Sequence, residues 1–136
     1  MVTVPSITHD GVQYLEADPD WLRGRGVPEN VILSALDDLR AAQVSAECRR
    51  RIYAEASAEA QTNMSLAAGI IGAKDAGTRS ASETAILTAA GTALQWVAEM
   101  RAAYRAIAAD PAADYLDDAA WPPLDEAVRS MIKENF

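Results

Sequence analysis

The stretch SASETAILTAAGTALQWVAEMRAAYRAIAADP, residues 80–111, decides the fold. Its apolar and small residues recur in alternating steps of four and three, which is the period of a helix that buries one face. The members of this seam are Ile86, Ala90, Ala93, Val97, Met100, Tyr104 and Ile107. Ser80 with Glu83 three positions later is a capping-box pattern, which marks the start of a helix. Pro111 cannot continue a helix, so we predict that the helix ends just before it.

The segment before this stretch also predicts helix, because no proline lies between residues 29 and 110. Pro28 and Glu29 suit a first helical turn. A stripe of small, apolar and amide residues follows at steps of three and four: Ile32, Leu36, Leu39, Gln43 and Ala46, then Tyr53, Ala56, Ala60, Asn63, Ala67 and Ile70. Residues 29–68 are therefore expected to form one helix roughly 60 Å long, or two nearly collinear helices with a break near residues 43–45. The loop 72–79 is short, so the helices on either side of it pack antiparallel.

The two ends of the chain are expected to be less regular. Asp10-Gly11 lies between two short runs of strand-forming residues, and this is a strong signal for a tight β-hairpin. Trp21 and Leu22 follow as a short helical anchor, and Trp121 is expected to fold back onto the helices before a last helix from Asp125 to Lys133. The predicted fold is mainly α: a long antiparallel helical hairpin with a small N-terminal β-hairpin and an irregular Trp-Pro tail. Its segments are residues 1–27 (β-hairpin and turn), 28–110 (helical hairpin) and 111–136 (acidic tail).

Composition excludes several functional classes. The chain has 136 residues, 12 Lys and Arg against 20 Asp and Glu, and a net charge of -8, which is the wrong sign for a protein that binds a phosphate backbone. One cysteine and one histidine supply neither an internal disulfide nor an ordinary His/Cys metal cage. We expect no metal, no cofactor, no membrane span, and no catalytic site, because no nucleophile and base can be paired. Of the 136 residues, 29 are alanine, which buries little area, so a partner or a second copy of the chain is expected to add stability.

The individual polar residues are interpreted as structural residues rather than as catalytic or metal-binding ones. His9 is interpreted as a surface turn residue. Arg49 favours a thiolate at Cys48, but no base accompanies this cysteine, so we interpret it as a small helix residue. The run Arg49-Arg50-Arg51 spreads over about 200° of helix surface, so ion pairs with Glu47 and Glu55 are favoured over a phosphate site. Residues 110–126 hold six acids and no base; a solvated linker is favoured, and a docking strip for a basic partner is the alternative.

The second half of the chain resembles bacteriophage tail-fibre assembly proteins and related small phage tail proteins. The resemblance spans roughly residues 45 to 123. It rests on an arginine-rich helix, a second helix with Gln95-Trp96-Val97 and Met100-Arg101-Ala102-Ala103-Tyr104, and the closing Trp121-Pro122-Pro123. It implies that Trp96, Arg101, Tyr104 and Trp121 bind the partner.

The resemblance leads to the functional expectation. The chain is expected to be a non-enzymatic protein that assists assembly of a tail fibre, or attaches to that fibre or another tail protein, in the host cytoplasm or in the finished virion tail. The alternative is a small acidic phage inhibitor that binds a basic host protein by charge mimicry.

Overall fold

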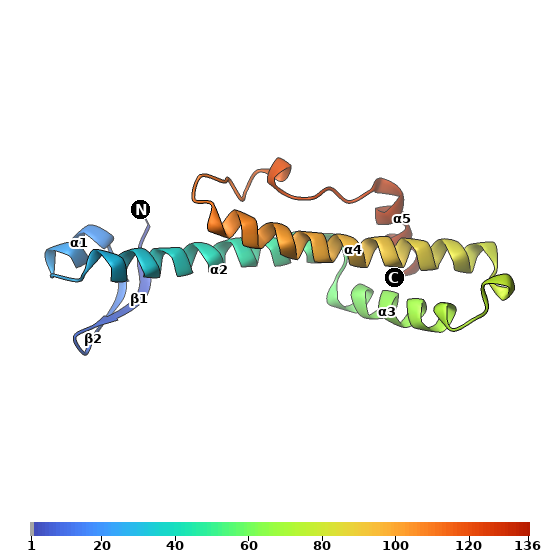
Figure 1. Ribbon diagram of the computed structural model, residues 1–136, viewed down its shortest axis with the longest axis horizontal. Helices are drawn as coiled ribbons and strands as arrows, with labels where there is room; N and C mark the ends of the chain where they lie inside the picture. Colours follow the sequence, from blue (N-terminus) through green and yellow to red (C-terminus); the bar gives the residue numbers. More distant parts are fainter. Residues whose placement is uncertain (1) are drawn as a thin grey trace. The chain divides into compact units, whose positions relative to one another are not determined.

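The computed structural model describes residues 2–136, which form two compact units, one ending at Ser45 and the other beginning at Ala46. The predicted fold class is confirmed: the chain is mainly helical, with one small antiparallel sheet of two strands among the described residues (Figure 1). The elements are β1 (Val4–His9), β2 (Val12–Ala17), α1 (Pro19–Gly24), α2 (Glu29–Glu55), α3 (Ala58–Gly72), the 3-10 turn η1 (Ala76–Thr78), α4 (Ala81–Ala109), the 3-10 turn η2 (Asp118–Ala120) and α5 (Glu126–Asn135).

The predicted β-hairpin is confirmed. β1 and β2 pair antiparallel around a two-residue turn, with His9 opposite Val12. Asp10 and Gly11 have φ of 50° and 76°, which is the left-handed conformation that a tight hairpin turn of this type requires at both positions. The twist of this turn matches that of the strands, so the turn sequence fixes the register of the pair.

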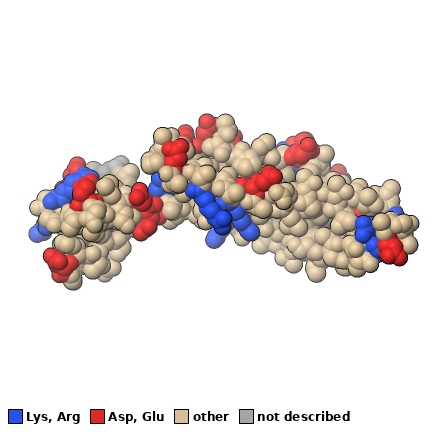
Figure 2. All heavy atoms as spheres, in the orientation of Figure 1, with Lys and Arg blue, Asp and Glu red and all other residues tan. Residues whose placement is uncertain are grey.

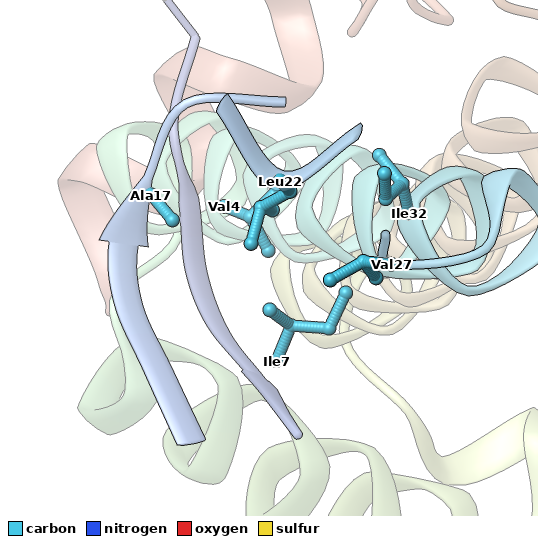
Figure 3. Close-up of a cluster of buried hydrophobic side chains, with 6 residues drawn as sticks. All are labelled: Val4, Ile7, Ala17, Leu22, Val27 and Ile32. Carbon is cyan, nitrogen blue, oxygen red and sulfur yellow. The ribbon is translucent and has the colours of Figure 1, made fainter. Parts of the chain in front are cut away.

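The buried face of the hairpin changes along its length. Ile7 lies opposite Tyr14 and Val4 lies opposite Ala17, so the inward positions are three residues apart rather than two. Glu16 accounts for this three-residue spacing, because its φ of 47° interrupts the regular alternation of side chains along the strand. The inward residues complete a small core with residues of α1 and the start of α2 (Figure 3): Val4, Ile7, Ala17, Leu22, Val27 and Ile32.

The helical anchor after the hairpin depends on Leu22. This side chain is fully buried, whereas Trp21 is 48% exposed, so the prediction was right for Leu22 and wrong for Trp21. Trp21 instead lies on the surface between two neighbours. Its ring is edge-on to Tyr14 at 5.7 Å, and the guanidinium of Arg25 is 4.9 Å from the ring centroid.

The long segment from residue 29 onward forms two helices, and the break is not where the sequence suggested. α2 is continuous through residues 43–45, and the chain leaves the helix only at Ala56 and Ser57. The Ser57 side chain accepts a hydrogen bond from the Ala60 backbone N–H at 3.1 Å, so it caps the start of α3. Serine as an N-cap, without a proline or glycine beside it, is the local signal that the apolar pattern concealed.

The predicted stripe of this segment is also partly wrong. Gln43, Ala46, Tyr53 and Ile70 are exposed. The buried residues follow steps of four instead, in the order Val44, Cys48, Ile52, Ala56, Ala60 and Met64. Alanine occurs on both buried and exposed faces of a helix, so it does not show which face is buried. With so many alanines, more than one choice of buried face fitted the sequence.

α4 agrees with its predicted pattern. Of the seven seam residues, Ala90, Ala93, Val97, Met100 and Ile107 are buried, and Ile86 and Tyr104 are half-buried. The capping box is present in full: the Glu83 N–H donates to the Ser80 hydroxyl at 3.0 Å, and the Ser80 N–H donates to the Glu83 carboxylate at 3.2 Å. α4 packs against α3 and α5, and the loop between α3 and α4 contains only η1.

The segment after α4 returns along this helix to α5, as Figure 1 shows. Trp121 is 6% exposed, which confirms that it folds onto the helices. Asp125 caps α5 by accepting from the Ala127 N–H at 2.8 Å. Among residues 2–136, no helix is both apolar and long enough to cross a membrane.

Candidate functional site

The contact between the end of α2 and α4 organises the candidate site. The Cys48 thiol donates to the Met100 carbonyl oxygen at 3.5 Å, and both side chains are buried. Burial raises the pKa of Cys48, and the nearby charge of Arg101 only partly opposes this effect. Cys48 is thus a protonated packing residue, as interpreted from the sequence.

The geometry of this contact divides the α2–α4 pair into two sides. Each residue lies about 100° further around the helix than the residue before it. When two antiparallel helices face each other through one residue each, the next residue of each helix therefore points to the same side of the pair. Arg49 and Arg101 follow Cys48 and Met100, so they share one side. Arg51 comes three positions after Cys48, and Trp96 comes four positions before Met100. Both therefore point to the opposite side of the pair. We call these the open side and the tail side.

The tail side is covered by residues 110–124 through two tryptophans. The Trp96 indole N–H donates to the Pro122 carbonyl at 2.9 Å, and the Trp121 indole N–H donates to the Tyr115 carbonyl at 2.8 Å. Each tryptophan is 6% exposed. The Trp-Pro element therefore attaches the tail to the helices through two indole groups, one from α4 and one from the tail.

Arg51 of α2 adds further contacts that hold the tail. Its guanidinium donates to Glu47 and Asp118, each at 2.7 Å, and to the Leu116 carbonyl at 3.1 Å. The same group lies 5.5 Å from the centroid of the Trp121 ring, which is within the range of a cation–π contact. Each of the three guanidinium nitrogens of Arg51 thus has an acceptor within the chain.

A cavity of about 370 Å³ lies beside Arg51 on the tail side, lined by Arg50, Arg51, Ala54, Glu55, Trp96, Met100, Asp118, Trp121, Pro122, Pro123, Leu124 and Arg129. Its cations already have partners. Arg50 donates to Glu47 at 2.7 Å, and Arg129 donates to Glu55 at 2.7 Å and also to Glu126. The predicted ion pairs of Glu47 are confirmed, while Glu55 pairs with Arg129 of α5 rather than with the arginine run.

The six acids of residues 110–126 also have partners within the chain. Four of them accept a hydrogen bond from a backbone N–H two positions later, in the manner of an Asx turn. These are Asp110, Asp114, Asp117 and Asp125. The other two, Asp118 and Glu126, pair with Arg51 and Arg129. The acids therefore shape and hold the tail, which the interpretation of a solvated linker did not include.

The open side carries cations that have no such partners. Arg49, Arg101 and Arg105 are exposed, and none of them forms an ion pair with a carboxylate among residues 2–136. Figure 2 shows basic side chains gathered over this part of α2 and α4. Two tyrosines accompany them: Tyr53 is 49% exposed, and the half-buried Tyr104 has its ring centroid 6.0 Å from the Arg105 guanidinium.

The four site residues implied by the resemblance divide between the two sides. Trp96 and Trp121 lie together under the tail, whereas Arg101 and Tyr104 lie on the open side. Sequence reasoning did not select Tyr53, Arg49 or Arg105 for this surface. The sequence did contain one signal for this surface. Arg101 and Arg105 are four residues apart on a helix whose buried seam was predicted, so both were expected on the same exposed face.

The remaining candidates stay isolated. The His9 Nε2 atom lies 3.4 Å from the Asp10 carboxylate in the hairpin turn. Within residues 2–136, no three His, Cys, Asp or Glu side chains converge in a way that suits a metal ion. No protein-family model matches the sequence, and no curated protein is detectably similar to it.

Proposed function

We propose that this chain is a non-enzymatic bacteriophage tail protein that assists the assembly of a tail fibre, or attaches to that fibre or another tail protein, through protein–protein contacts. It would act in the host cytoplasm during assembly and then leave or remain in the virion tail. The resemblance of residues 45–123 to tail-fibre assembly proteins is the origin of this proposal.

One observation supports a binding role above the others. The tail is fastened over one side of the α2–α4 pair, and the other side keeps Arg49, Arg101 and Arg105 free of carboxylate partners. Arginine and tyrosine are enriched at protein interfaces, because both combine a flat contact surface with hydrogen-bonding groups. We assign the partner contact to the open side and a supporting role to Trp96 and Trp121.

Co-expression with a tail-fibre protein, sought among the genes that neighbour this one, tests the proposal. We expect the fibre to become soluble and trimeric only in the presence of this chain, and the two to co-purify. A fibre that is soluble and trimeric alone, and that never co-purifies with the chain, would overturn the proposal. Mass spectrometry of purified particles then distinguishes an assembly factor from a virion component.

The acidic inhibitor is the second candidate, and the net charge of -8 is what favours it. It requires the tail acids to face a basic host protein, although each already serves the tail. Asp114→Asn, Asp117→Asn and Asp125→Asn remove charge and keep the oxygen that accepts the turn hydrogen bond. Loss of salt-sensitive binding to a basic host protein in this triple variant would support the inhibitor; unchanged binding would dismiss it.

A further inference from the structure

We propose that the open side of the α2–α4 pair binds an acidic segment of a partner polypeptide, with Arg49, Arg101 and Arg105 as its carboxylate-binding groups. This inference rests on the proposed function for its context, since a tail partner would present the segment. It goes further by naming the surface and the chemistry that the surface recognises.

The first argument is the contrast among the cations of the chain. Arg23, Arg50, Arg51, Lys74 and Arg129 each form an ion pair with a carboxylate. The chain has 20 acids for 12 bases, so carboxylates are abundant. Arg25 instead lies over the Trp21 ring, and Arg79 donates to backbone carbonyls. Arg49, Arg101 and Arg105 differ from the other cations because they lie together on one side of one helix pair without a carboxylate partner, and each offers five N–H donors in a planar fork that fits a carboxylate.

The second argument is spacing. Arg101 and Arg105 are one helical turn apart, about 6 Å along α4 at about 1.5 Å per residue. Acidic residues two apart in an extended peptide lie about 6.6 Å from each other and point to the same side. Arg49 lies on α2, on the same side of the helix pair, and packed helix axes are about 8–10 Å apart. The surface thus fits an extended Asp/Glu-x-Asp/Glu segment that lies along α4 and is held from α2.

The third argument concerns the class of partner. A nucleic acid would also offer anions, but a long phosphate backbone would meet the field of a chain with net charge -8. A short acidic peptide engages only the local patch. Tyr53 and Tyr104 add phenolic hydroxyls and apolar ring surface beside the arginines, which suits the mixed side chains of a polypeptide.

A direct binding measurement with short probes tests this inference. Fluorescence anisotropy would follow a labelled peptide of alternating Glu and Ser, a matched peptide with Gln in place of Glu, and a long single-stranded DNA. We expect the Glu peptide to bind the whole protein at low salt and to weaken as salt rises, because exposed charges are screened. We expect the Gln peptide and the DNA to bind at least tenfold more weakly.

The variant Arg49→Gln/Arg101→Gln/Arg105→Gln is expected to lose at least tenfold in affinity for the Glu peptide. The control variant is Arg25→Gln/Lys133→Gln, which removes two exposed cations away from the open side and should retain affinity. Circular dichroism of both variants verifies folding. Unchanged peptide binding in the triple variant, or DNA binding as tight as that of the Glu peptide, would overturn the inference.

Co-purification with the fibre separates this inference from the proposed function. If the triple variant loses the Glu peptide and also the fibre, the inference is supported. If it still co-purifies with the fibre as the parent chain does, then the assignment of the open side is wrong while the proposed function stands.

Discussion

At the scale of single residues, the tail depends on a few side chains with several contacts each. Arg51 reaches from α2 to two points of the tail and also stacks near Trp121. Trp96 and Trp121 both use the indole N–H to hold a tail carbonyl, while their rings fill the space beneath. Because the tail has no long regular element of its own before α5, these contacts determine its conformation.

Removing the Trp121 ring should destabilise the protein strongly. Trp121→Ala creates a cavity at a buried position and removes the cation–π partner of Arg51, so we expect a loss of about 3–5 kcal/mol in the free energy of unfolding. Trp96→Phe keeps most of the ring and loses the hydrogen bond to Pro122, for about 1 kcal/mol. Urea unfolding measures both; equal losses in the two variants would contradict this assignment of roles.

Glu47 should make stability depend on acid pH. Hydrogen bonds from Arg50, and secondly from Arg51, hold the pKa of Glu47 below its ordinary value of 4.5, although burial opposes them. As pH falls, the unfolded chain takes up this proton first, so the stabilising effect is present above about pH 4.5 and is lost as pH falls through the folded pKa.

The variant Glu47→Gln tests this dependence. We expect it to be less stable than the parent chain at pH 7 and to lose less stability between pH 5 and about pH 3. Glu134→Gln, at an exposed position of α5, is the matched control and should retain the parental pH profile. Parallel profiles for Glu47→Gln and the parent chain would show that this carboxylate has no such role.

At the scale of elements, the predictable features are those with a local chemical cause. The Asp10-Gly11 turn and the Ser80–Glu83 capping box each need particular side chains or φ values, and both occur where the sequence predicts them. The break at Ala56 and Ser57 was not predicted, because its local signal is the Ser57 N-cap alone, with no proline or glycine beside it. The open side was only half predicted, because sequence reasoning did not show that Arg51 of the arginine run is held by Asp118 and the Leu116 carbonyl of the tail while Arg49 is not.

The capping box should contribute measurably to α4. Ser80→Ala leaves the Glu83 backbone N–H without its hydroxyl acceptor, and such a change typically costs about 1 kcal/mol. Ser80→Asp can accept the same hydrogen bond and should keep stability near that of the parent chain. Thermal unfolding compares them, and a Ser80→Ala protein as stable as the parent would mean that the start of α4 frays in solution.

At the scale of the whole molecule, two compact units are described, and α4 is the central element of the second. α3, α5 and the end of α2 all pack against it, and the tail runs back along it. The first unit has its own core, built by the hairpin, α1 and the start of α2. α4 contributes more buried residues than any other element of the second unit, so the stability of this unit should depend most on α4.

Hydrogen exchange should reveal this distribution. We expect the slowest amide exchange of the second unit in residues 93–107 of α4, because opening there disrupts the contacts of several neighbours. Residues 110–118 should exchange faster by at least two orders of magnitude, since turns and single hydrogen bonds protect them. Similar rates in both segments, measured by mass spectrometry on the folded protein, would contradict a central role for α4.

The placement of the three tryptophans gives the molecule built-in spectroscopic reporters. Trp21 is 48% exposed in the first unit, whereas Trp96 and Trp121 are shielded in the second. Indole emission shifts to longer wavelength in water, so Trp21→Phe should leave a blue-shifted spectrum that comes only from the two indoles beneath the tail. Lifting of the tail would then be visible as a red shift without any added label.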